Sequence, residues 1–509
     1  MKAAITLLVL AVSFAADCAA ASNWTMFAAN PQHTGEVKAE KRLNKRSAGK
    51  LKLHWKARLD NTAKELTSLL VPVAVTDVKG SSRAKNYLIV AGSDDNVFAL
   101  NADNGAVLWR RHFAVTAKPK QAPDWLCPNA LTATPVIDRQ RRLVYALASD
   151  GQLYTLGVVT GEDAQPPRQM IPAFAKTWSL TLTNGVIYTA TSQACNGVRS
   201  AIYAMSADEG APREFLAMRT YGAGIWGRAG VSIGSDNTVF AETGDGAFDA
   251  QKGQYANTIL AVNGTTLQLK DYFTPANHAY IFKKDLDLGN MTPVVFRYGS
   301  KELIAASGKE GVIYLLDTSC LGGDDHATPL FKSDLYANAA GSYYGRGFWG
   351  ALSARSGEKG VQWLYAPAWG PATEQTKFKI TYGDAPSGSV MAFQVTGPDT
   401  HPVLTPVWRS TDMAVPEPVA IANGVVFALS NGENVTQNDA NGRLLKSEFR
   451  ASHPAGHAVL YALDGDTGAV LYSSGDAISS FTHFGGLAIA GGQVFVSAWD
   501  GTVYAFSTR

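Results

Sequence analysis

A short phrase recurs along nearly the whole chain, and its period constrains the fold more than any single residue does. Residues 97–109 read VFALNADNGAVLW, and residues 459–472 read VLYALDGDTGAVLY. Fainter copies begin at residues 152, 201, 259, 312 and 390, and the chain ends inside another. Each copy alternates apolar and polar residues, turns at a glycine that often follows Asp or Asn, and resumes the alternation, which is typical of a half-buried β-hairpin. Hairpins repeated in this way predict an array of similar units.

The segment before each hairpin completes the unit. Most copies follow an apolar strand and a turn, as in LTNGVIYTAT from Leu182 and IANGVVFALS from Ile421. About four strands per unit result, and four-stranded sheets at a fixed period are the blades of a β-propeller. Eight blades after a short leader leave roughly 61 residues per blade, more than in the shorter propeller repeats. The sequence therefore predicts an all-β, eight-bladed propeller as one domain over residues 22–509, with long loops on one face.

Both ends of the chain are predicted to close the ring. The last copy stops at Arg509 without its outer strand. Residues 51–59, LKLHWKARL, alternate like an outer strand and have no hairpin partner before them. We therefore expect this N-terminal strand to complete the last blade, so that no sheet edge is left to pair with another chain.

The first residues resemble a secretory signal. Lys2 precedes an apolar run over residues 5–16, and small residues follow, so we expect a signal peptide over residues 1–21 and a periplasmic or secreted protein. The run is too short to remain as a transmembrane span. Cys18 raises the alternative of lipidation, although Asp17 before it is not the small residue that bacterial lipid attachment prefers.

Composition and charge argue against several classes of function. With 46% hydrophobic and 17% charged residues and 48 glycines, the chain is typical of a globular protein rich in turns. Its net charge of +2 argues against a nucleic-acid-binding surface. The sequence contains no nucleophile elbow, phosphate loop or zinc-ligand spacing, and no Cys-x-x-Cys-His site for covalent haem. Serine-hydrolase, nucleotide-dependent and zinc-enzyme functions therefore have no support.

The repeated hairpin, of the type Ala-Leu-Asp-x-x-Thr-Gly-x-x-x-Trp, carries a family resemblance. Eight such blades behind a signal peptide resemble the PQQ-binding-like propellers, over essentially the whole mature chain. This family includes quinoprotein alcohol dehydrogenases and a non-catalytic outer-membrane assembly lipoprotein. The repeat is specific for the fold and weak for the chemistry, since function resides in the sites that a fold carries. Because the dehydrogenases hold a planar quinone and a calcium ion on the propeller axis, the resemblance implies a site there.

Three residues match positions that the resemblance assigns to this site. The segment GIWGRAGVSIGSDNTVFAETGDG places Trp226 as the floor beneath the quinone and Asp245 at a calcium-ligand position. An indole offers a flat apolar face, and a carboxylate is a good ligand for a hard cation. Lys309 falls where the family has Arg or Lys against the quinone oxygens, and a cation there would stabilise charge on the reduced cofactor.

Two other positions depart from the family pattern. The family's Ala-Glu-x-Gly-Val-Arg segment supplies a calcium-binding Glu, but ACNGVR places Cys195 there, and a neutral sulfur is a poor calcium ligand. The family's Thr-Pro-x-x-x-Trp-Asp segment supplies the general base, but TPANHAY places Tyr280 there. A phenol with a pKa of about 10 is a weak base at neutral pH. His278 is an alternative base, although a histidine in a polar loop is more often only solvated.

The cysteines suggest what replaces the missing metal ligand. Family members often carry a vicinal disulfide beside the quinone, in the loop that leads into the second blade, whereas this loop has only Cys127. Cys195 is expected on the same face of the ring. We therefore hypothesise a Cys127–Cys195 disulfide across the mouth of the site, which would join two blades. Cys320 would then remain as a structural or free thiol.

A glycine-rich aromatic loop forms a further candidate surface. The segment GSYYGRGFWGAL and the one that follows it contain Tyr343, Tyr344, Arg346, Phe348, Trp349, Trp363 and Trp369. These residues fit the wall of a binding mouth and packing at the start of a blade equally well, and we assign Trp349 as a further cofactor contact. Asp249 is a second possible metal carboxylate, but turn capping fits it better. Residues 283–290, KKDLDLGN, are expected to form a solvated loop.

Two functions remain open. In the first, the chain is a quinoprotein-like oxidoreductase that holds PQQ and calcium, oxidises a small alcohol or sugar, and passes electrons to a separate acceptor. In the second, it keeps the propeller without the cofactor chemistry and binds a protein or glycan of the cell envelope. Trp226, Asp245 and Lys309 favour the first, whereas the departures at Cys195 and Tyr280 favour the second. On the family resemblance alone, we expect the oxidoreductase.

Overall fold

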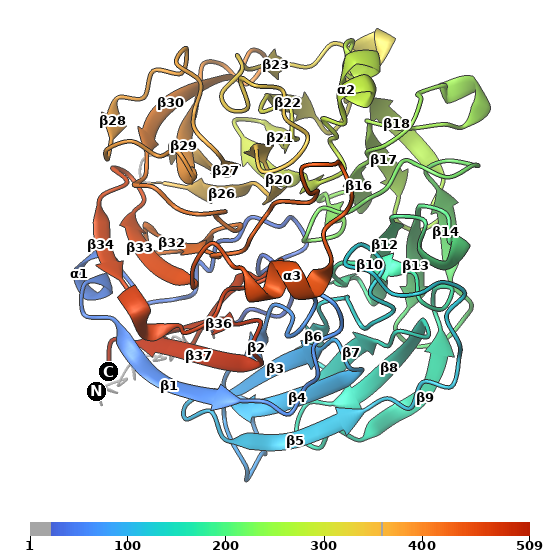
Figure 1. The fold of residues 1–509 in the computed structure, drawn as a ribbon, viewed down its shortest axis with the longest axis vertical. Coiled ribbons are helices and arrows are strands. Elements are labelled where there is room, and N and C mark those ends of the chain that lie inside the picture. Colours follow the sequence, from blue (N-terminus) through green and yellow to red (C-terminus); the bar gives the residue numbers. More distant parts are fainter. Residues whose placement is uncertain (1–21, 358–359) are drawn as a thin grey trace, which may run out of the picture.

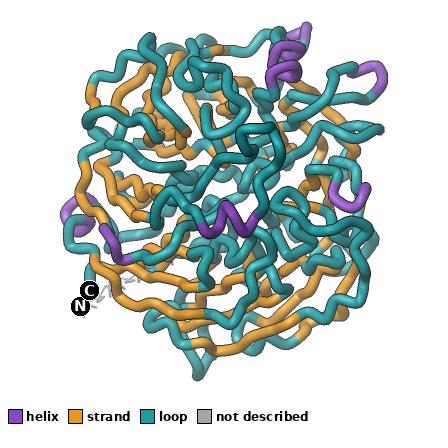
Figure 2. The backbone as a smooth tube through the Cα atoms, viewed as in Figure 1, coloured by secondary structure: helices purple, strands orange, loops and turns teal. Residues whose placement is uncertain are grey.

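The computed structural model describes residues 22–357 and 360–509, so the predicted signal peptide and Cys18 lie outside the described residues. Within these ranges, eight sheets of four or more strands stand in a ring around a central axis (Figure 1). The strands lie toward the outside of the ring, and long loops cover its centre in the view of Figure 2. The predicted eight-bladed propeller is therefore confirmed.

In each of the first four blades, neighbouring strands are antiparallel and follow one another in sequence order from the axis outward. Blades 1 and 2 contain β2 (Val73–Val75), β3 (Tyr87–Gly92), β4 (Asn96–Asn101) and β5 (Val107–His112), then β6 (Val136–Asp138), β7 (Leu143–Leu147), β8 (Gln152–Gly157) and β9 (Asp163–Gln169). Blades 3 and 4 contain β10 (Lys176–Thr177), β11 (Thr181–Thr183), β12 (Val186–Ser192), β13 (Ala201–Ser206) and β14 (Arg213–Leu216), then β15 (Ser232–Ile233), β16 (Thr238–Glu242), β17 (Ile259–Asn263) and β18 (Leu269–Phe273).

The remaining blades continue the ring, and blade 6 is the largest. Blades 5 and 6 contain β20 (Val294–Tyr298), β21 (Lys301–Ser307), β22 (Ile313–Asp317) and β23 (Phe331–Lys332), then β24 (Gly347–Phe348), β26 (Ser353–Ser356), β27 (Gln362–Trp369), β28 (Ile380–Thr381), β29 (Gly388–Thr396) and β30 (Val403–Arg409). Blades 7 and 8 contain β31 (Ala420–Ala422), β32 (Val425–Ser430), β33 (Val459–Asp464) and β34 (Val470–Ser473), then β35 (Leu487–Ala490), β36 (Gln493–Ser497), β37 (Thr502–Ser507) and β1 (Lys52–Arg58).

A few short elements lie outside the blades. A parallel pair joins β19 (Met291–Thr292) to β25 (Gly350–Ala351). Within the described ranges, the α-helices are α1 (Lys45–Ala48), α2 (His278–Lys284) and α3 (Ser447–Ser452). The 3₁₀ turns there include η1 (Cys195–Gly197), η2 (Ala250–Lys252), η3 (Gly323–Asp325) and η5 (Gly475–Ala477). In the described part of the chain, no helix has both the length and the apolar character needed to cross a bilayer.

The N-terminal strand closes the ring. β1 pairs antiparallel with β37, from Lys52 opposite Ser507 to Arg58 opposite Thr502. In Figure 1, β1 (blue) thus lies beside β37 (red) at the edge of the last blade. The prediction for residues 51–59 is confirmed.

At three places in the ring, a tryptophan on an outer strand attaches one blade to the next. Trp109 Nε1 donates a hydrogen bond to the Val158 carbonyl at 2.9 Å. Its ring lies against Gly161, where a Cβ atom would come within 2.6 Å of the indole. The same contact recurs between Trp55 and Gly105 and between Trp408 and Gly468. The glycine of the phrase therefore forms the hairpin turn and also leaves room for the indole of the preceding blade.

The segment over residues 24–37 crosses the propeller axis, which the sequence did not reveal. Its backbone oxygens accept hydrogen bonds from the innermost strands of six blades, at Ala74, Ile137, Ile233, Val295, Ala354 and Ile421. His33 is fully buried beside this path, with its ring nitrogens 3.1 Å from the Phe27 carbonyl oxygen and 2.7 Å from that of Val231. We call residues 24–37 the axial plug, because they tie the inner ends of the blades together.

Candidate functional site

A cavity of about 240 Å³ lies at the centre of the ring, among the inner ends of the blades. Its lining comes from the inner strands and loops of blades 2 to 8, including many residues far apart in sequence. Four predicted site residues line it: Trp226, Asp245, Lys309 and Trp349. The structure thus brings together the residues assigned to the quinone and the metal.

Lys309 is central to one wall of the cavity. It lies between β21 and β22, and its Nζ is 2.8 Å from Asp285 Oδ1 and 2.6 Å from Asp287 Oδ2. The same nitrogen lies 5.6 Å from the ring centroids of both Trp226 and Trp349, which is within cation–π range. Burial lowers the pKa of Lys309, but the two carboxylates outweigh it and hold that pKa above its ordinary value. Lys309 is therefore a fixed positive charge between two indoles.

Three carboxylates form an acidic cluster around this lysine. One oxygen each from Asp245, Asp285 and Asp287 lies within 4.8 Å of the others. The Asp245 side chain is open to solvent, yet the surrounding protein and the charge of Asp287 raise its pKa to about 7. Burial likewise raises the pKa of Asp285 to about 7. Asp287 is also buried, but Lys309 and hydrogen bonds keep its pKa below the ordinary value. The cluster therefore takes up and releases protons near neutral pH.

The donor set of this cluster suits a hard cation. Asn290 is buried and lines the same cavity, and its Nδ2 donates to the Phe348 carbonyl at 2.6 Å. The Oδ1 atom of Asn290 is enclosed and has no hydrogen-bond partner within the described ranges. Carboxylate and amide oxygens are the ligands that calcium prefers, and an unpartnered buried oxygen is costly unless something binds it. The residues present therefore fit an oxygen-ligated cation.

The predicted catalytic residues lie elsewhere. His278 and Tyr280 are on α2, and neither lines the cavity. Tyr280 is 47% exposed, and the His278 ring packs edge-on against Phe248 with their centroids 5.3 Å apart. A catalytic role for these two residues stays a prediction, and neither of them contacts the cavity. The carboxylates that do line the cavity in this region, Asp285 and Asp287, come five and seven residues after Tyr280.

The expectation of a solvated loop over residues 283–290 is wrong. Leu286, Asp287 and Leu288 are each 1% exposed, because this stretch turns inward after α2 toward the axis. The alternation Asp-Leu-Asp-Leu directly after a helix was the available signal. Two charges between apolar residues are typical of a strand-like segment with one face in a polar site rather than in bulk water.

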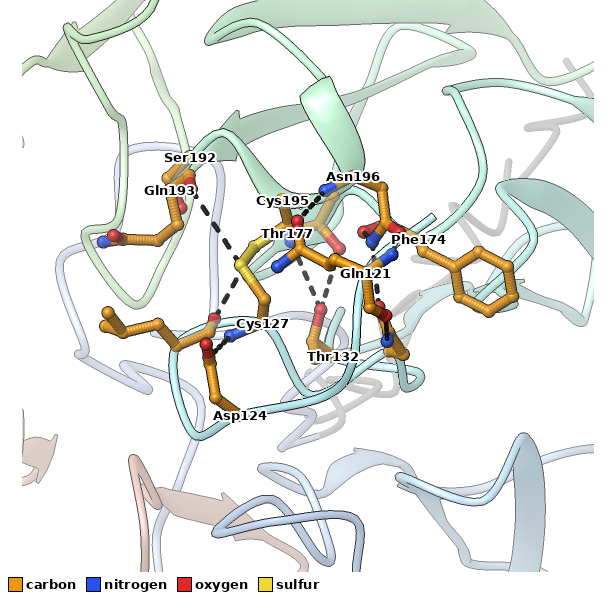
Figure 3. Close-up of a disulfide and its surroundings, with 12 residues drawn as sticks. Gln121, Asp124, Cys127, Thr132, Phe174, Thr177, Ser192, Gln193, Cys195 and Asn196 are labelled. Atoms are coloured by element: carbon orange, nitrogen blue, oxygen red, sulfur yellow. Dashed lines mark hydrogen bonds between the residues drawn. A yellow bond between two sulfur atoms is a disulfide. The ribbon is translucent and has the colours of Figure 1, made fainter. Parts of the chain in front are cut away.

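The Cys127–Cys195 disulfide is confirmed, with its Cα atoms 5.4 Å apart. It joins the loop that enters blade 2 to η1 in blade 3 (Figure 3). Both cysteines are buried and neither lines the cavity, whereas their neighbours Leu126 and Gln193 do. The bridge therefore stands behind the cavity wall and not across its mouth. Asn196 reinforces it, since its Oδ1 accepts from the Lys120 amide at 2.7 Å.

The aromatic loop divides between the cavity and the blade. Trp349 stacks on Trp369 at 4.4 Å between centroids, with the rings 8° from parallel, and Trp349 Nε1 donates to the Arg346 carbonyl at 2.6 Å. Trp349 borders the cavity and Trp369 supports it from behind. Trp363 does not extend this wall, because it stacks on Tyr365 within the blade 6 sheet.

Two remaining sequence interpretations are confirmed. Asp249 caps η2, since its side chain accepts a hydrogen bond from the Lys252 backbone amide, and it does not join the acidic cluster. Cys320 is a free, exposed thiol.

A basic wall faces the acidic cluster, and the sequence did not reveal it. Lys176 on β10 and Arg228, which lies between β14 and β15, are both buried and line the cavity. Arg228 forms an ion pair with the buried Glu417, and its guanidinium lies 4.7 Å from the Phe484 ring centroid. Burial lowers the pKa of Arg228 to about 9. The cavity is therefore lined by buried basic residues as well as by the acidic cluster.

The comparisons with known proteins agree with this architecture. The family model described as outer membrane protein assembly factor BamB matches residues 20–213. Quinohemoprotein alcohol dehydrogenase from Comamonas testosteroni has the same fold, with a TM-score of 0.62 and 14% identity over 96% of this chain and 80% of that one. A europium-containing methanol dehydrogenase reaches 0.61, with 11% identity over 96% of this chain and 98% of that one.

A non-enzymatic name also occurs among the structural matches. BamB from Moraxella catarrhalis gives a TM-score of 0.51 and 12% identity over 90% of this chain and 99% of that one. No curated protein sequence matches the chain significantly. At these identities the structural matches establish the fold alone. Over residues 20–213 the chain is similar to the PQQ-like repeat propellers, and the structural matches show that the whole described chain has their eight-bladed fold.

Proposed function

We propose that this protein is a quinoprotein-like oxidoreductase of the cell envelope, which binds PQQ and calcium in the axial cavity and oxidises a small alcohol or sugar. The observation that carries the proposal is the meeting of Trp226, Lys309, Trp349 and the acidic cluster at one cavity. The Cys127–Cys195 disulfide supports an oxidising compartment such as the periplasm.

The residues of the cavity suit a planar, anionic quinone. Trp226 and Trp349 offer flat apolar faces, and Lys309 between them offers a positive charge to quinone oxygens. On the basic wall, the enclosed Nη2 atom of Arg228 has no hydrogen-bond partner within the described ranges and would suit a carboxylate. Asp245, Asp287 and Asn290 would hold the calcium ion. A bound quinone supplies an acceptor for the two electrons that leave the substrate carbon.

Asp285 is the residue best suited to receive the substrate hydroxyl proton. Its pKa of about 7 lies near the working pH, which is where a general base is most effective. Lys309, 2.8 Å away, holds the carboxylate in position. Asp245 has a similar pKa and offers a second site for the proton. The proposed base is therefore Asp285 in place of Tyr280 or His278.

The test is reconstitution. The mature protein would be mixed with PQQ and calcium, passed through a desalting column, and assayed for quinone absorbance and for dye reduction with primary alcohols, sugars and polyols. We expect retention of PQQ by the wild type and by Trp363→Phe, a control that does not line the cavity, and loss of retention in Trp226→Ala. Absence of both retained quinone and substrate-dependent dye reduction in the wild type would overturn the proposal.

A second candidate function is a binding scaffold in the cell envelope. The match of residues 20–213 to the BamB family model favours it, because that description names an assembly factor and not an enzyme. In this case PQQ would not be retained, and an envelope protein or glycan would bind the loop-covered face instead. Cross-linking of the protein in its host, compared with a Tyr221→Ser variant of an exposed aromatic residue, would detect such a partner.

A further inference from the structure

The cavity contains two buried lysines in opposite electrostatic settings. Lys309 and Lys176 are 6% and 4% exposed, so both lie away from bulk water. Lys309 makes ion pairs with Asp285 and Asp287. Lys176 makes no ion pair and no side-chain hydrogen bond with any residue in the described part of the chain, and its Nζ lies 4.9 Å from the Trp178 ring centroid. Burial without a carboxylate partner disfavours the charged ammonium and so lowers the pKa of a lysine.

The charged groups around Lys176 do not replace a carboxylate partner. Lys176 also lines a second, smaller void together with Arg228 and His483. Neither of these two side chains carries a negative charge that could pair with an ammonium. Glu433 is also buried, but its carboxylate pairs with Arg450 at 2.7 Å and with His483 at 2.9 Å. Asp124 raises the pKa of Lys176 through its charge but forms no hydrogen bond with it. One oxygen of the Asp124 carboxylate accepts a hydrogen bond from the Cys127 amide at 2.7 Å. Burial thus prevails and lowers the pKa of Lys176 to about 7.

We propose that Lys176 is a carbonyl-reactive amine, which condenses with an aldehyde that enters the cavity to form an imine. The Nζ lone pair attacks the carbonyl carbon, the C–O bond breaks, and a C=N bond forms. The carbonyl oxygen leaves as water together with the two hydrogens of the neutral amine, so no oxidant or reductant is consumed. This inference goes beyond the proposed function, because it needs only the cavity and the amine and not a bound quinone.

Lys176 has the two properties that an imine-forming lysine requires. At pH 7 about half of an amine with a pKa near 7 is neutral, against about one in a few thousand for an ordinary lysine with a pKa of about 10.4. The cavity wall around it is aromatic, with Trp178 beneath the amine and Phe484 packed edge-on against Trp178 at 5.0 Å. Such a wall excludes water and accepts the apolar part of a small aldehyde.

The test is site-resolved reductive alkylation of the mature, disulfide-intact protein without added PQQ. Acetaldehyde and sodium cyanoborohydride would be added at several pH values from 6 to 10, and early labelling would be measured by peptide mass spectrometry. At pH 7 we expect Lys176 to react at least about tenfold faster than Lys332, an exposed lysine that also lies over an aromatic ring, at 5.9 Å from Tyr314. Its rate should level off above about pH 8, and Lys309 should stay unlabelled at pH 7.

Two variants complete the test. In Lys176→Met the fast phase of labelling should disappear from the intact mass, whereas Lys332→Met should leave it unchanged. If Lys176→Met does not fold, the wild-type pH profile still decides. Labelling of Lys176 no faster than Lys332 at pH 7, or no labelling at any pH, would overturn the inference and would favour a charged Lys176 that holds an anion. A failure of PQQ retention would leave the labelling result untouched, so the two proposals fail separately.

Discussion

Lys309 Nζ lies 2.6 Å from Asp287 Oδ2, and both side chains are buried beside the propeller axis. Lys309 therefore holds Asp287 in its ionised state inside the protein. Removing one partner of a buried ion pair leaves an uncompensated charge, which typically costs about 3 to 5 kcal/mol.

We accordingly expect Lys309→Met to lower the free energy of unfolding by about 3 kcal/mol. The double variant Lys309→Met with Asp287→Asn should recover part of this loss, because the orphaned charge is then gone. Urea denaturation monitored by tryptophan fluorescence would measure both. Equal stability of the single variant and the wild type would mean that solvent reaches Asp287 and that the pair is not buried in solution.

Protons and a cation should compete for the acidic cluster. Asp245 and Asp285 have pKa values of about 7, so near neutral pH the free protein carries protons that a divalent cation would displace. We expect calcium affinity to rise between about pH 5.5 and pH 7.5 and to level off above that range. Calorimetry in two buffers of different ionisation enthalpy would count the protons released.

The control for this linkage is Asp285→Asn. It removes one titrating group, so fewer protons should be released and calcium affinity at pH 7.5 should fall. The negative control is Asp249→Asn. Asp249 lies outside the acidic cluster, so this variant should leave calcium binding unchanged. Calcium binding that does not vary across this pH range would contradict the assignment of the cluster as the cation site.

The fold was predictable because its information is repeated and local. Strand alternation and the Gly and Trp of each hairpin specify one blade, and the Trp109 contact with Gly161 shows how that phrase also links neighbouring blades. Trp226, Asp245 and Lys309 were found because the segments that contain them resemble site segments of the family.

The rest of the site lacked such a pattern. Asp285 and Asp287 come after α2, five and seven residues beyond the position where the family pattern has its general base. Lys176 and Arg228 are single charges within apolar segments, and only the assembled ring shows that they face one cavity. The axial plug binds through backbone atoms, which leave no signature in side-chain order.

The Cys127–Cys195 bridge should contribute to global stability. It closes a loop with a sequence separation of 68 residues, and restricting the unfolded chain in this way is worth on the order of 4 kcal/mol. The double variant Cys127→Ser with Cys195→Ser should therefore unfold at lower urea concentration than the wild type. Cys320→Ser, which removes the free thiol, should not change the midpoint. Equal midpoints for all three proteins would show that blades 2 and 3 are held without the bridge.

The axial plug should make the propeller acid-sensitive through His33. Burial lowers the pKa of this imidazole to about 4, from an ordinary value near 6.5. Between those two pH values the unfolded chain binds a proton that the folded chain refuses, so stability is present above about pH 6.5 and is lost as the pH falls toward 4. The difference corresponds to about 3 kcal/mol. Thermal unfolding of the wild type should show a fall in midpoint across this range.

His33→Gln would separate this effect from general acid denaturation. An amide keeps a donor for one of the two backbone carbonyls, Phe27 or Val231, but does not titrate. The variant should be less stable than the wild type at pH 7.5, because the packing around the imidazole is lost, and the gap should narrow by pH 5. His457→Gln, at a partly exposed histidine outside the plug, serves as the control and should follow the wild-type curve. If the unfolding midpoints of His33→Gln and the wild type differ by the same amount at every pH, protonation of His33 does not destabilise the fold.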